Sequence, residues 1–574
     1  MKKYIQYALV SMLSVLMWAC SSDETGDGVQ TRDGKVALAK AVTFHVNFAG
    51  YNATQEVGTR ATAANSVVAQ KATVLDNGIV AVTTVQRDTT QQAPAATTRA
   101  LDNGTYTMLA YQGGVFKGEV KGHISGGTFA YADNNAIELQ PGTYDFVLIN
   151  DKVTRTGNKI TVKKDDMEQG LIGRTTYTVT ATPQHQQVTF EMHPTAMRIK
   201  FRVLGYMNFT LSDGPSGKTG EFLVASSGSI PTKVEYDIAN NTWITVEHST
   251  PNYSRMLTFP AATQDGVTYT STNPDYVYYL PGRQSAFVLV LGKVDIYDRT
   301  IDYARRGIDS YMAASVEPGT SYLFTIKFLM PAYYLMSDGS VGKTSETTAA
   351  GGTKTPIGVV LSRSKHLAIA LEDAGKGAKF KWYKENSDEN MTGDGPIGLS
   401  MYDRGDYMQV LDYTNGYECT WDNRVPAYDV PTRKGDNKTD FPAFYAAGHY
   451  GDELAAKMTL TNGMENKKWY LPGAGEWLYL YTVFGKGDLM DLNWDTYTWN
   501  HYAPCTVSHT NAIFTQVGGM YAKDQYWSST QAGNFNYGDL TTVPLVASIT
   551  PVDQFECNVW DKSYEWKVRA FVKY

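Results

Sequence analysis

The sequence reads Val42-Thr-Phe44-His-Val46-Asn-Phe48 near its start, and every second residue of this stretch is apolar. Because successive side chains of a β-strand point to opposite faces, this spacing predicts a strand with one buried face. The alternation recurs in Tyr144-Asp-Phe146-Val-Leu148 and continues, interrupted by Gly, Asn, Asp and Pro, to about residue 330. Helical spacing is almost absent from this region. The sequence therefore predicts a mainly β fold built of antiparallel β-sandwiches.

Changes in composition divide the chain into segments. Residues 61–98 are rich in Ala, Thr, Gln and Val, which favours a long loop. Nine of the eleven tryptophans lie at or beyond Trp382, so we expect a different fold from about residue 331. The composition therefore separates a β-rich region that ends at about residue 330 from a C-terminal domain over residues 331–574.

The beginning of the chain has the pattern of an export signal. Lys2-Lys3 precedes an apolar run, Tyr7–Ala19, that is too short to span a bilayer. Cys20 follows a small residue, which resembles the lipoprotein pattern in which the thiol takes a diacylglycerol before cleavage. We expect a signal peptide at residues 1–19 and a lipidated, palmitate-bearing tether at 20–37. A plain cleaved signal peptide is the alternative.

Location and partners are indicated by the next residues and by the charge. The run Ser21-Ser-Asp-Glu24 resembles the acidic export tag of surface-exposed bacterial lipoproteins, so we expect the chain on the outer membrane or in a fimbrium. The net charge of the 574 residues is −7, and no Lys/Arg block is interleaved with aromatic residues. This argues against a nucleic-acid partner. The longest later apolar run, Ala286–Leu291, is far shorter than a membrane-spanning helix, which leaves lipid as the expected attachment.

Three motifs in the β-rich region carry a family resemblance. They are Arg99-Ala-Leu-Asp-Asn-Gly-Thr-Tyr106-Thr-Met-Leu-Ala-Tyr111, Leu139-Gln-Pro-Gly-Thr-Tyr144-Asp-Phe-Val-Leu148 and Val188-Thr-Phe-Glu-Met-His-Pro-Thr-Ala-Met-Arg-Ile-Lys-Phe201. Their order and spacing resemble the fimbrillin family of pilus subunits and anchors. The match covers about residues 38–330 and implies two β-sandwich domains, the first over residues 38–195 and the second over residues 196–330.

The resemblance to fimbrillins implies a mode of assembly. In that family a protease cuts after an arginine behind the first strand, and a neighbouring subunit donates a strand to the vacated groove. Here the removable strand would be Val42–Phe48. The cut would fall at Arg60-Ala61, with Arg99-Ala100 as the other candidate. The alternative is that both arginines lie in ordinary solvated loops.

The last 244 residues carry a second resemblance, to the Fibrobacter major paralogous domain and its C-type-lectin-like fold. It rests on an ordered set of motifs. These are Tyr333-Tyr-Leu-Met-Ser-Asp-Gly339, Phe441-Pro-Ala-Phe444, Trp469-Tyr-Leu-Pro-Gly-Ala-Gly-Glu-Trp477, Tyr526-Trp-Ser-Ser-Thr530 and Lys567-Val-Arg-Ala-Phe571. The resemblance implies an α+β surface binding module over residues 331–574.

Large apolar and aromatic residues of this module fall into two groups. Trp469, Leu471, Trp477 and Trp527 stand in strand-turn and helix-start patterns, which predicts that they form the core. The aromatic residues of a less patterned insertion are the candidate ligand-binding residues, because exposed rings stack on sugar faces. They are Trp494, Tyr497, Trp499, Tyr502 and Tyr537.

Cofactor and catalytic motifs are weak throughout. The run Gly339-Ser-Val-Gly-Lys-Thr344 lacks the first glycine of a phosphate loop. The spacing of His501, Cys505 and His509 would suit zinc on a helix, but Pro504 interrupts that helix and no fourth ligand is evident. A calcium-loop pattern starting at residue 388 lacks its closing Glu. We predict no metal and no cofactor, with calcium left open.

The remaining cysteines bear on catalysis. Cys419, Cys505 and Cys557 could hold one disulfide, and their pairing is left open. No hydrolase or nucleotide fingerprint occurs. An oxidase of the sulfatase-modifying type would need a reactive thiol at Cys505 or Cys557, whose contexts are unlike that family's motif. We therefore predict that the chain is not an enzyme.

These observations predict a surface lipoprotein that serves as the tip or a minor subunit of a pilus. It would receive a donor strand from another subunit and present its C-terminal adhesin domain to a host or bacterial glycan or protein. It has no evident strand of its own to give. The alternative is a non-polymerising, glycan-binding surface lipoprotein of a polysaccharide-uptake system.

Overall fold

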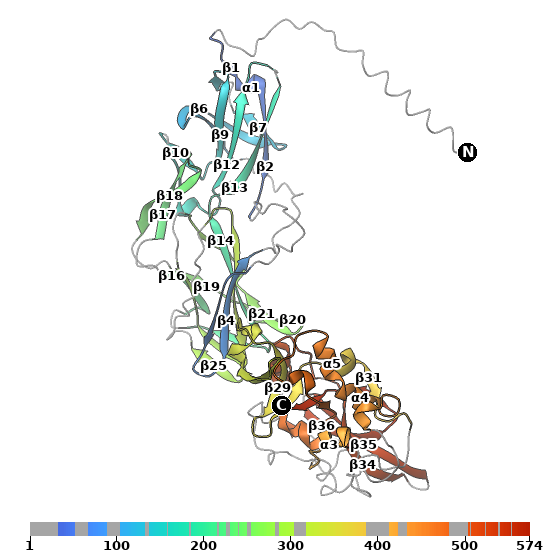
Figure 1. The fold of residues 1–574 in the computed structure, drawn as a ribbon. Helices are drawn as coiled ribbons and strands as arrows, with labels where there is room; N and C mark the ends of the chain where they lie inside the picture. The colour runs from blue at the N-terminus through green and yellow to red at the C-terminus, as the bar shows by residue number, and fades with distance from the viewer. Residues whose placement is uncertain are drawn as a thin grey trace, which may run out of the picture. The chain divides into compact units, whose positions relative to one another are not determined.

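The computed structural model describes most of the chain beyond residue 32. The described residues are 33–51, 67–88, 104–132, 137–157, 159–182, 185–214, 217–225, 230–238, 240–249, 254–281, 286–302, 317–385, 412–422, 433–480, 503–504, 507–522, 524–537, 540–552 and 554–574. Strands dominate them (Figure 1), which confirms the predicted mainly β fold. No helix within these ranges has the length and apolarity needed to cross a membrane.

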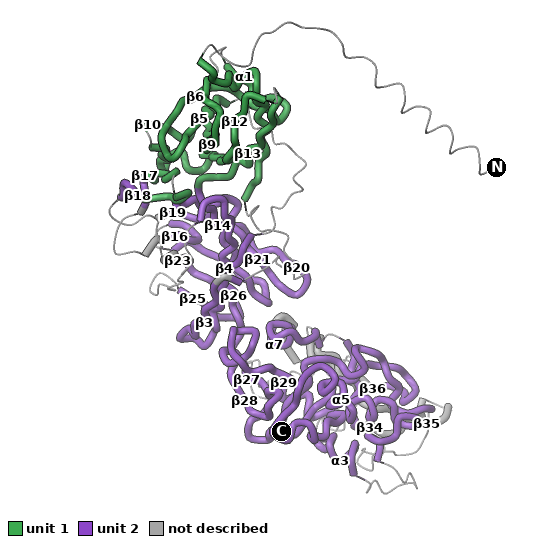
Figure 2. Tube along the Cα trace, turned by 45° about the horizontal axis from the view of Figure 1, so that its top comes forward, with its two compact units in different colours: residues 1–54, 92–195, 233–244 green, residues 55–91, 196–232, 245–574 purple. Residues whose placement is uncertain are grey.

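The chain forms two compact units (Figure 2). The first contains residues 1–54, 92–195 and 233–244, and the second contains residues 55–91, 196–232 and 245–574. One division between the units falls after residue 195, and the predicted domain bounds stay predictions. Two segments cross it, because residues 55–91 belong to the second unit and 233–244 to the first.

Seven strands of the first unit close into a barrel in the order β12-β13-β2-β7-β6-β5-β9. Their bounds are β2 (Val42–Phe48), β5 (Tyr106–Gln112), β6 (Val115–Ser125), β7 (Thr128–Tyr131), β9 (Gly142–Asn150), β12 (Leu171–Val179) and β13 (Gln186–Pro194). All neighbours are antiparallel except β2 and β13. A second small sheet, β1 (Val36–Ala37) with β8 (Glu138–Leu139), and the short helix α1 (Leu38–Ala41) precede β2.

The barrel core consists of the inward residues that the alternation predicts. Phe44 lies at the centre, with its ring 5.3 Å from that of Phe146 and 5.8 Å from that of Phe190. All three side chains are almost fully buried. Such aromatic clusters stabilise a core through burial and through edge and offset contacts between rings.

A four-stranded sheet completes the first unit. Its order is β10-β11-β17-β18. The bounds are β10 (Thr154–Thr156), β11 (Lys159–Lys163), β17 (Ile230–Asp237) and β18 (Thr242–Ser249). β11 pairs with β17 across 70 residues of sequence, with Ile160 opposite Tyr236. This pairing explains why residues 233–244 join the first unit.

The second unit begins with three sheets. The largest has the order β20-β21-β14-β26-β4-β3, with β22 also on β14, and the smaller ones are β15-β24-β25 and β19-β16-β23. The bounds are β3 (Val67–Val74), β4 (Val80–Arg87), β14 (Met197–Gly205), β15 (Thr210–Ser212), β16 (Gly220–Ala225), β19 (Ser254–Leu257), β20 (Thr263–Asp265), β21 (Thr268–Thr272), β22 (Val277–Tyr279), β23 (Ala286–Leu291), β24 (Lys293–Ile296), β25 (Arg299–Asp302) and β26 (Ser321–Leu329).

Within the segment 61–98, which we expected to contain a long loop, the described residues 67–88 include two strands. They form the hairpin β3–β4, and β4 pairs with β26 at eight positions. Asn77-Gly78 makes the turn, and Gly78 has a φ of +83°. Asn-Gly is a strong hairpin signal, and here Gly78 supplies the left-handed position of a three-residue turn between Leu75 and Ile79. This dipeptide could have revealed the hairpin.

Among the described residues from 331 onward there are two further sheets and four α-helices. The sheets have the orders β28-β27-β29-β30-β38-β32 and β31-β37-β34-β35-β36-β33. The strands are β27 (Tyr333–Met336), β28 (Val341–Lys343), β29 (Pro356–Ser362), β30 (Leu367–Ala370), β31 (Lys379–Lys381), β32 (Trp469–Tyr470), β33 (Ala503–Pro504), β34 (Tyr526–Tyr537), β35 (Leu540–Val552), β36 (Gln554–Asp561), β37 (Glu565–Lys567) and β38 (Phe571–Lys573). The helices are α3 (Gly416–Trp421), α4 (Pro442–Gly448), α5 (Tyr450–Ala455) and α7 (Val507–Thr515).

The core prediction for the C-terminal region is confirmed. Trp469, Leu471, Trp477 and Trp527 are all fully buried. Large rings fill the space between short elements, which offer few regular side-chain ladders of their own. The mixture of helices and sheets agrees with the α+β class expected here, and the C-type-lectin-like fold stays a prediction.

Candidate functional site

The strand β2 holds an unusual place in the first barrel, and this place is the candidate functional site. On one side β2 runs parallel to β13 over seven register pairs, from Val42 with Gln186 to Phe48 with Met192. On the other side it meets β7 at a single register pair, His45 with Thr128. The amide of Val46 donates a hydrogen bond to the carbonyl of Gly127 at 2.7 Å. β2 is therefore held mainly by one neighbour.

The side chains of β2 fill a groove in the barrel. Val42, Phe44 and Val46 are at most 4% exposed, whereas Thr43 and Asn47 point outward. Phe48 closes the strand and is 45% exposed. Without β2, the barrel would lack a strand between β13 and β7 and would expose the rings around Phe44. Such a site can be refilled only by a strand with apolar residues at alternate positions.

The segments flanking β2 are fixed by backbone bonds. The amide of Leu38 donates to the carbonyl of Ile137 at 3.0 Å, and the amide of Ala49 donates to that of Met192 at 3.0 Å. After Tyr51 the chain leaves the described residues and returns as β3 at Val67 in the second unit. β2 and the strand that follows it in sequence thus belong to different compact units.

Both predicted cleavage sites lie outside the described residues. Arg60-Ala61 falls between β2 and β3, and Arg99-Ala100 falls between β4 and β5. Their positions in the topology differ. A cut at the first would disconnect only β2 and what precedes it, whereas a cut at the second would also disconnect the hairpin β3–β4. That hairpin includes Ala81 and Val85, which belong to the core of the second unit.

The C-terminal strand β38 is also inserted between two neighbours. Phe571 pairs with Ile369 of β30 and with Tyr470 of β32. Two residues earlier, the fully buried Arg569 lies with its Nε 2.7 Å from Oδ1 of Asp373. Its Nη1 donates to the carbonyl of Leu371 at 2.7 Å. The neighbouring Asp373 and the Tyr526 hydroxyl raise the pKa of Arg569, although burial opposes this. The motif residue Arg569 thus anchors β38.

Glu476, which the sequence places in a helix first turn, occupies a buried capping position. It lies in the first turn of the short 3-10 helix Ala474–Leu478, and its Oε2 accepts a hydrogen bond from the amide of Gly473 at 2.8 Å. Its Oε1 accepts one from the hydroxyl of Tyr470 at 2.7 Å. Burial raises the pKa of Glu476 to about 7, although these hydrogen bonds lower it. The carboxyl therefore titrates near neutral pH.

Most predicted ligand and lipid residues lie outside the described part of the chain. This holds for Cys20 and for Trp494, Tyr497, Trp499 and Tyr502. Tyr537 ends β34 and pairs with Leu540 across a hairpin turn. These positions remain predictions.

The cysteine and histidine candidates are not brought together in the described residues. Cys419 is free and buried in α3, and Cys557 lies in β36 opposite Ile549. His509 is buried in α7, with Nε2 3.1 Å from Oδ2 of Asp298. His501 and Cys505 lie outside the described residues. No group of three or more His, Cys, Asp and Glu side chains suited to a metal occurs among the described residues.

Comparisons with known proteins add distant structural likenesses. No protein-family model matches the chain, and no curated protein matches it. A fimbrial protein from Bacteroides ovatus is similar at 13% identity, covering 93% of this chain and 99% of its own, with a TM-score of 0.26. A fimbrial protein from Bacteroides vulgatus is similar at 14% identity, covering 42% and 91%, with a TM-score of 0.28. These scores are low, so the description of the site rests on the chain's own residues.

Proposed function

We propose that the chain is a fibre subunit of the cell surface, in which the first barrel strand is replaced by a donor strand from another subunit. The observation that carries this proposal is the one-sided hold on β2, whose apolar side chains fill a groove between β13 and β7. The function lies in adhesion, with the C-terminal domain presented at the tip or on a minor subunit. The ligand is a glycan or a protein, and the chain catalyses no reaction.

The energetics of exchange favour a donor with the same alternation as β2. Burying a Val or Phe side chain contributes roughly 1.5–3 kcal/mol. The three inward side chains of β2, Val42, Phe44 and Val46, therefore contribute several kcal/mol that a donor must replace. A donor also restores the main-chain hydrogen bonds to β13. Replacement of one strand by a similar one is near neutral in free energy, so a second subunit can drive it by adding contacts of its own.

The topology favours Arg60-Ala61 over Arg99-Ala100 as the cleavage site. A cut after residue 60 separates β2 while β4 stays connected to the body of the protein. A cut after residue 99 would leave β4 bound only by its pairing with β26 and β3. A cut after residue 60 would also separate Cys20 and its lipid from the body. Release from the membrane and opening of the groove would then be one event.

The burial of the C-terminal strand β38 bears on whether this subunit donates or accepts a strand in a fibre. β38 lies between β30 and β32, and Phe571 and Val572 are fully buried. For this segment to serve as a donor, it would have to leave both neighbours and the core. We therefore place the chain as an acceptor of a donor strand.

Limited digestion tests the proposal. An arginine-specific protease should cut the folded chain to leave a new N-terminus at Ala61. Arg60→Gln should abolish this product, and the matched variant Arg99→Gln should retain it. A synthetic peptide with the sequence of residues 38–51 should then bind the cut, β2-depleted protein. The same peptide with Phe44→Asp should not, because a carboxylate cannot enter the apolar groove without a large desolvation cost.

The results that would contradict strand exchange can be told apart from those that concern the ligand. A chain that keeps its N-terminus at Cys20 and excludes the peptide would support the non-polymerising, glycan-binding lipoprotein of a polysaccharide-uptake system. Binding of the full chain to a glycan and matrix-protein array, with and without calcium, addresses the ligand. Trp494→Ala and Trp499→Ala should weaken glycan binding, since a stacked ring contributes much of such contacts.

A further inference from the structure

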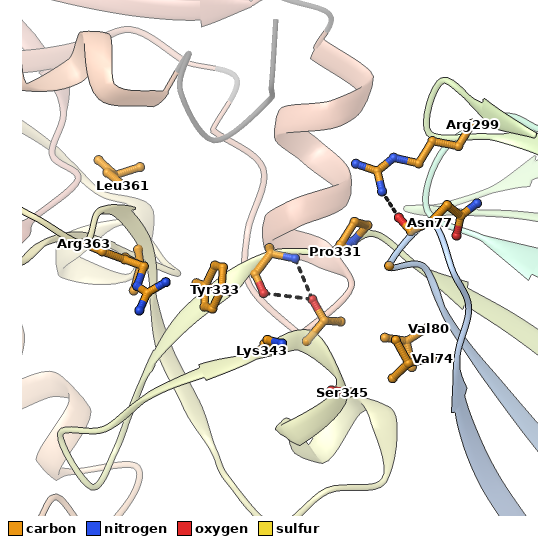
Figure 3. Close-up of a pocket in the computed structure, with 14 residues that line it drawn as sticks. Val74, Asn77, Val80, Arg299, Pro331, Tyr333, Lys343, Ser345, Leu361 and Arg363 are labelled. Atoms are coloured by element: carbon orange, nitrogen blue, oxygen red, sulfur yellow. Dashed lines mark hydrogen bonds between the residues drawn. The ribbon is translucent and has the colours of Figure 1, made fainter.

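A cavity of about 510 Å³ lies within the second unit, between its β-rich part and its C-terminal part (Figure 3). Its walls come from the β3–β4 turn, the start of β25, the chain entering β27, the end of β28 and the end of β29. The lining residues are Val74, Asn77, Gly78, Val80, Arg299, Pro331, Ala332, Tyr333, Lys343, Thr344, Ser345, Val360, Leu361 and Arg363. The volume falls within the range of about 300–1,000 Å³ that is usual for small-ligand sites.

The fold positions one wall of the cavity firmly. Tyr333 and Lys343 are directly opposite each other in the antiparallel pair β27–β28, so their side chains share a face. Thr344, which is almost fully buried, accepts a hydrogen bond from the amide of Ala332 at 2.9 Å and donates one to the carbonyl of Met330 at 2.9 Å. These bonds fix the turn that carries Lys343 at the edge of the cavity.

The opposite wall is fixed by the β3–β4 turn. A Cβ on Gly78 would lie 3.4 Å from Cβ of Pro331, so the turn already approaches the chain entering β27 closely. The guanidinium of Arg299 donates to the carbonyl of Asn77 (Figure 3). The glycine and this bond hold the Arg299 guanidinium at the rim.

The lining carries three positive charges and no carboxylate. Arg299, Lys343 and Arg363 are exposed at the cavity, and no described carboxylate lies within ion-pair distance of any of them. Arg363 lies over the ring of Tyr333, with its Cζ 5.0 Å from the ring centroid. Glu346, the carboxylate closest in sequence to Lys343, accepts from the Lys343 amide and pairs with Lys354 at 3.3 Å. This cationic rim stands out on a chain whose net charge is −7.

We propose that this cavity binds an acidic saccharide, through a carboxylate or sulfate group on the sugar. Guanidinium and ammonium groups form strong, charge-assisted hydrogen bonds to such anions, and an arginine can do so with two parallel bonds. Tyr333, which is 37% exposed, offers part of a ring for contact with a sugar, and Asn77 and Ser345 offer polar groups for hydroxyls. A concave, mixed wall of this kind suits a sugar better than an extended acidic peptide.

An acidic saccharide as ligand makes the proposed adhesive function more specific. Its binding does not depend on strand exchange, because the cavity is lined by residues of the second unit and β2 belongs to the first. None of the lining residues stands among the aromatic candidates that the sequence indicated. Lys343 belongs to the run Gly339–Thr344, which lacks the first glycine of a phosphate loop. In the structure this run forms the end of the turn after β27, the strand β28 and the first residue of the 3-10 helix Thr344–Glu346.

Calorimetric titration of the full chain tests the inference. The probes are a sulfated heparin tetrasaccharide, a carboxylated tri-galacturonate, neutral maltotriose and a poly-glutamate peptide. At least one acidic sugar should bind and maltotriose should not, and binding should weaken as NaCl rises. Lys343→Gln and Arg363→Gln should each weaken binding by about tenfold or more, as expected for a lost charge-assisted hydrogen bond. Lys121→Gln, which removes an equal exposed charge from β6, should change binding less than about twofold.

Every other result overturns the assignment. Absence of binding by both acidic sugars to folded protein would exclude the site. Unchanged binding in both Lys343→Gln and Arg363→Gln, or an equal loss in Lys121→Gln, would show that the attraction is not made by this cavity. Tighter binding of the peptide, with the same dependence on Lys343 and Arg363, would assign the cavity to acidic proteins instead. None of these results bears on cleavage at Arg60.

Discussion

The strands β2 and β38 occupy similar places but are held differently. Each lies between two neighbouring strands and carries buried apolar side chains. β2 is paired along its whole length with β13 and at one register pair with β7. β38 is paired on both sides and is preceded by Arg569, which is buried against Asp373. We therefore expect β2, and not β38, to be the strand that can be exchanged.

The largest effect that we expect concerns the groove of β2. Phe44→Ala should lower the free energy of unfolding of the first unit by about 4 kcal/mol, because a fully buried ring is replaced by a cavity. Urea unfolding followed by hydrogen exchange of the β13 amides measures it. Phe48→Ala, on the same strand but 45% exposed, should change the free energy by less than about 0.5 kcal/mol. Equal effects of the two variants would mean that the Phe44 ring does not hold β2.

The next effect concerns the anchor of β38. Arg569→Met should destabilise the C-terminal region by about 3 kcal/mol, since it leaves the buried Asp373 with only Lys567, at 3.3 Å, as a charged partner. Tryptophan fluorescence in urea reports on this region, because nine of the eleven tryptophans lie at or beyond Trp382. Lys573→Gln, on β38 itself, is the control, because it removes a partly exposed charge that pairs with Glu418 and lies over the rings of Tyr417 and Tyr470. A loss no greater than in this control would remove the distinction between β2 and β38.

A smaller effect concerns pH. The pKa of Glu476 is about 7 in the folded protein and near 4.5 when unfolded, so the folded state binds the proton more tightly. Stability should therefore fall as the pH rises from 5 to 7, by about 2 kcal/mol from this group. Glu476→Gln should flatten this part of the profile, whereas the exposed Glu418→Gln should not. A slope that persists in Glu476→Gln would assign the titration to another group.

Local patterns predicted a large part of the fold. The alternation around Val42, Phe44 and Val46 predicts both a strand and the face that is buried, because side-chain direction depends only on neighbouring residues. The burial of Trp469, Trp477 and Trp527 follows from their size and their strand-turn contexts. The hairpin β3–β4 was missed because its composition suggested a loop, although Asn77-Gly78 marks its turn.

The candidate sites were less accessible to such reasoning. Lys343 and Arg363 share a cavity only because β28 and the end of β29 flank β27, and Arg299 joins them from a strand 30 residues or more away in sequence. No local sequence pattern indicates that these three residues line one cavity. The one-sided hold on β2 is equally hidden, since it depends on a parallel partner, β13, about 140 residues further along.

The sequence by itself determined the β-rich class, the inward faces of the strands and the aromatic core of the C-terminal region. These depend on the periodicity and size of side chains, which short segments contain in full. Only the tertiary structure decided that β2 and β3 lie in different units, that Arg569 anchors β38 and that three cations share one cavity. These depend on which distant strands pair, and pairing is set by the packing of the whole chain.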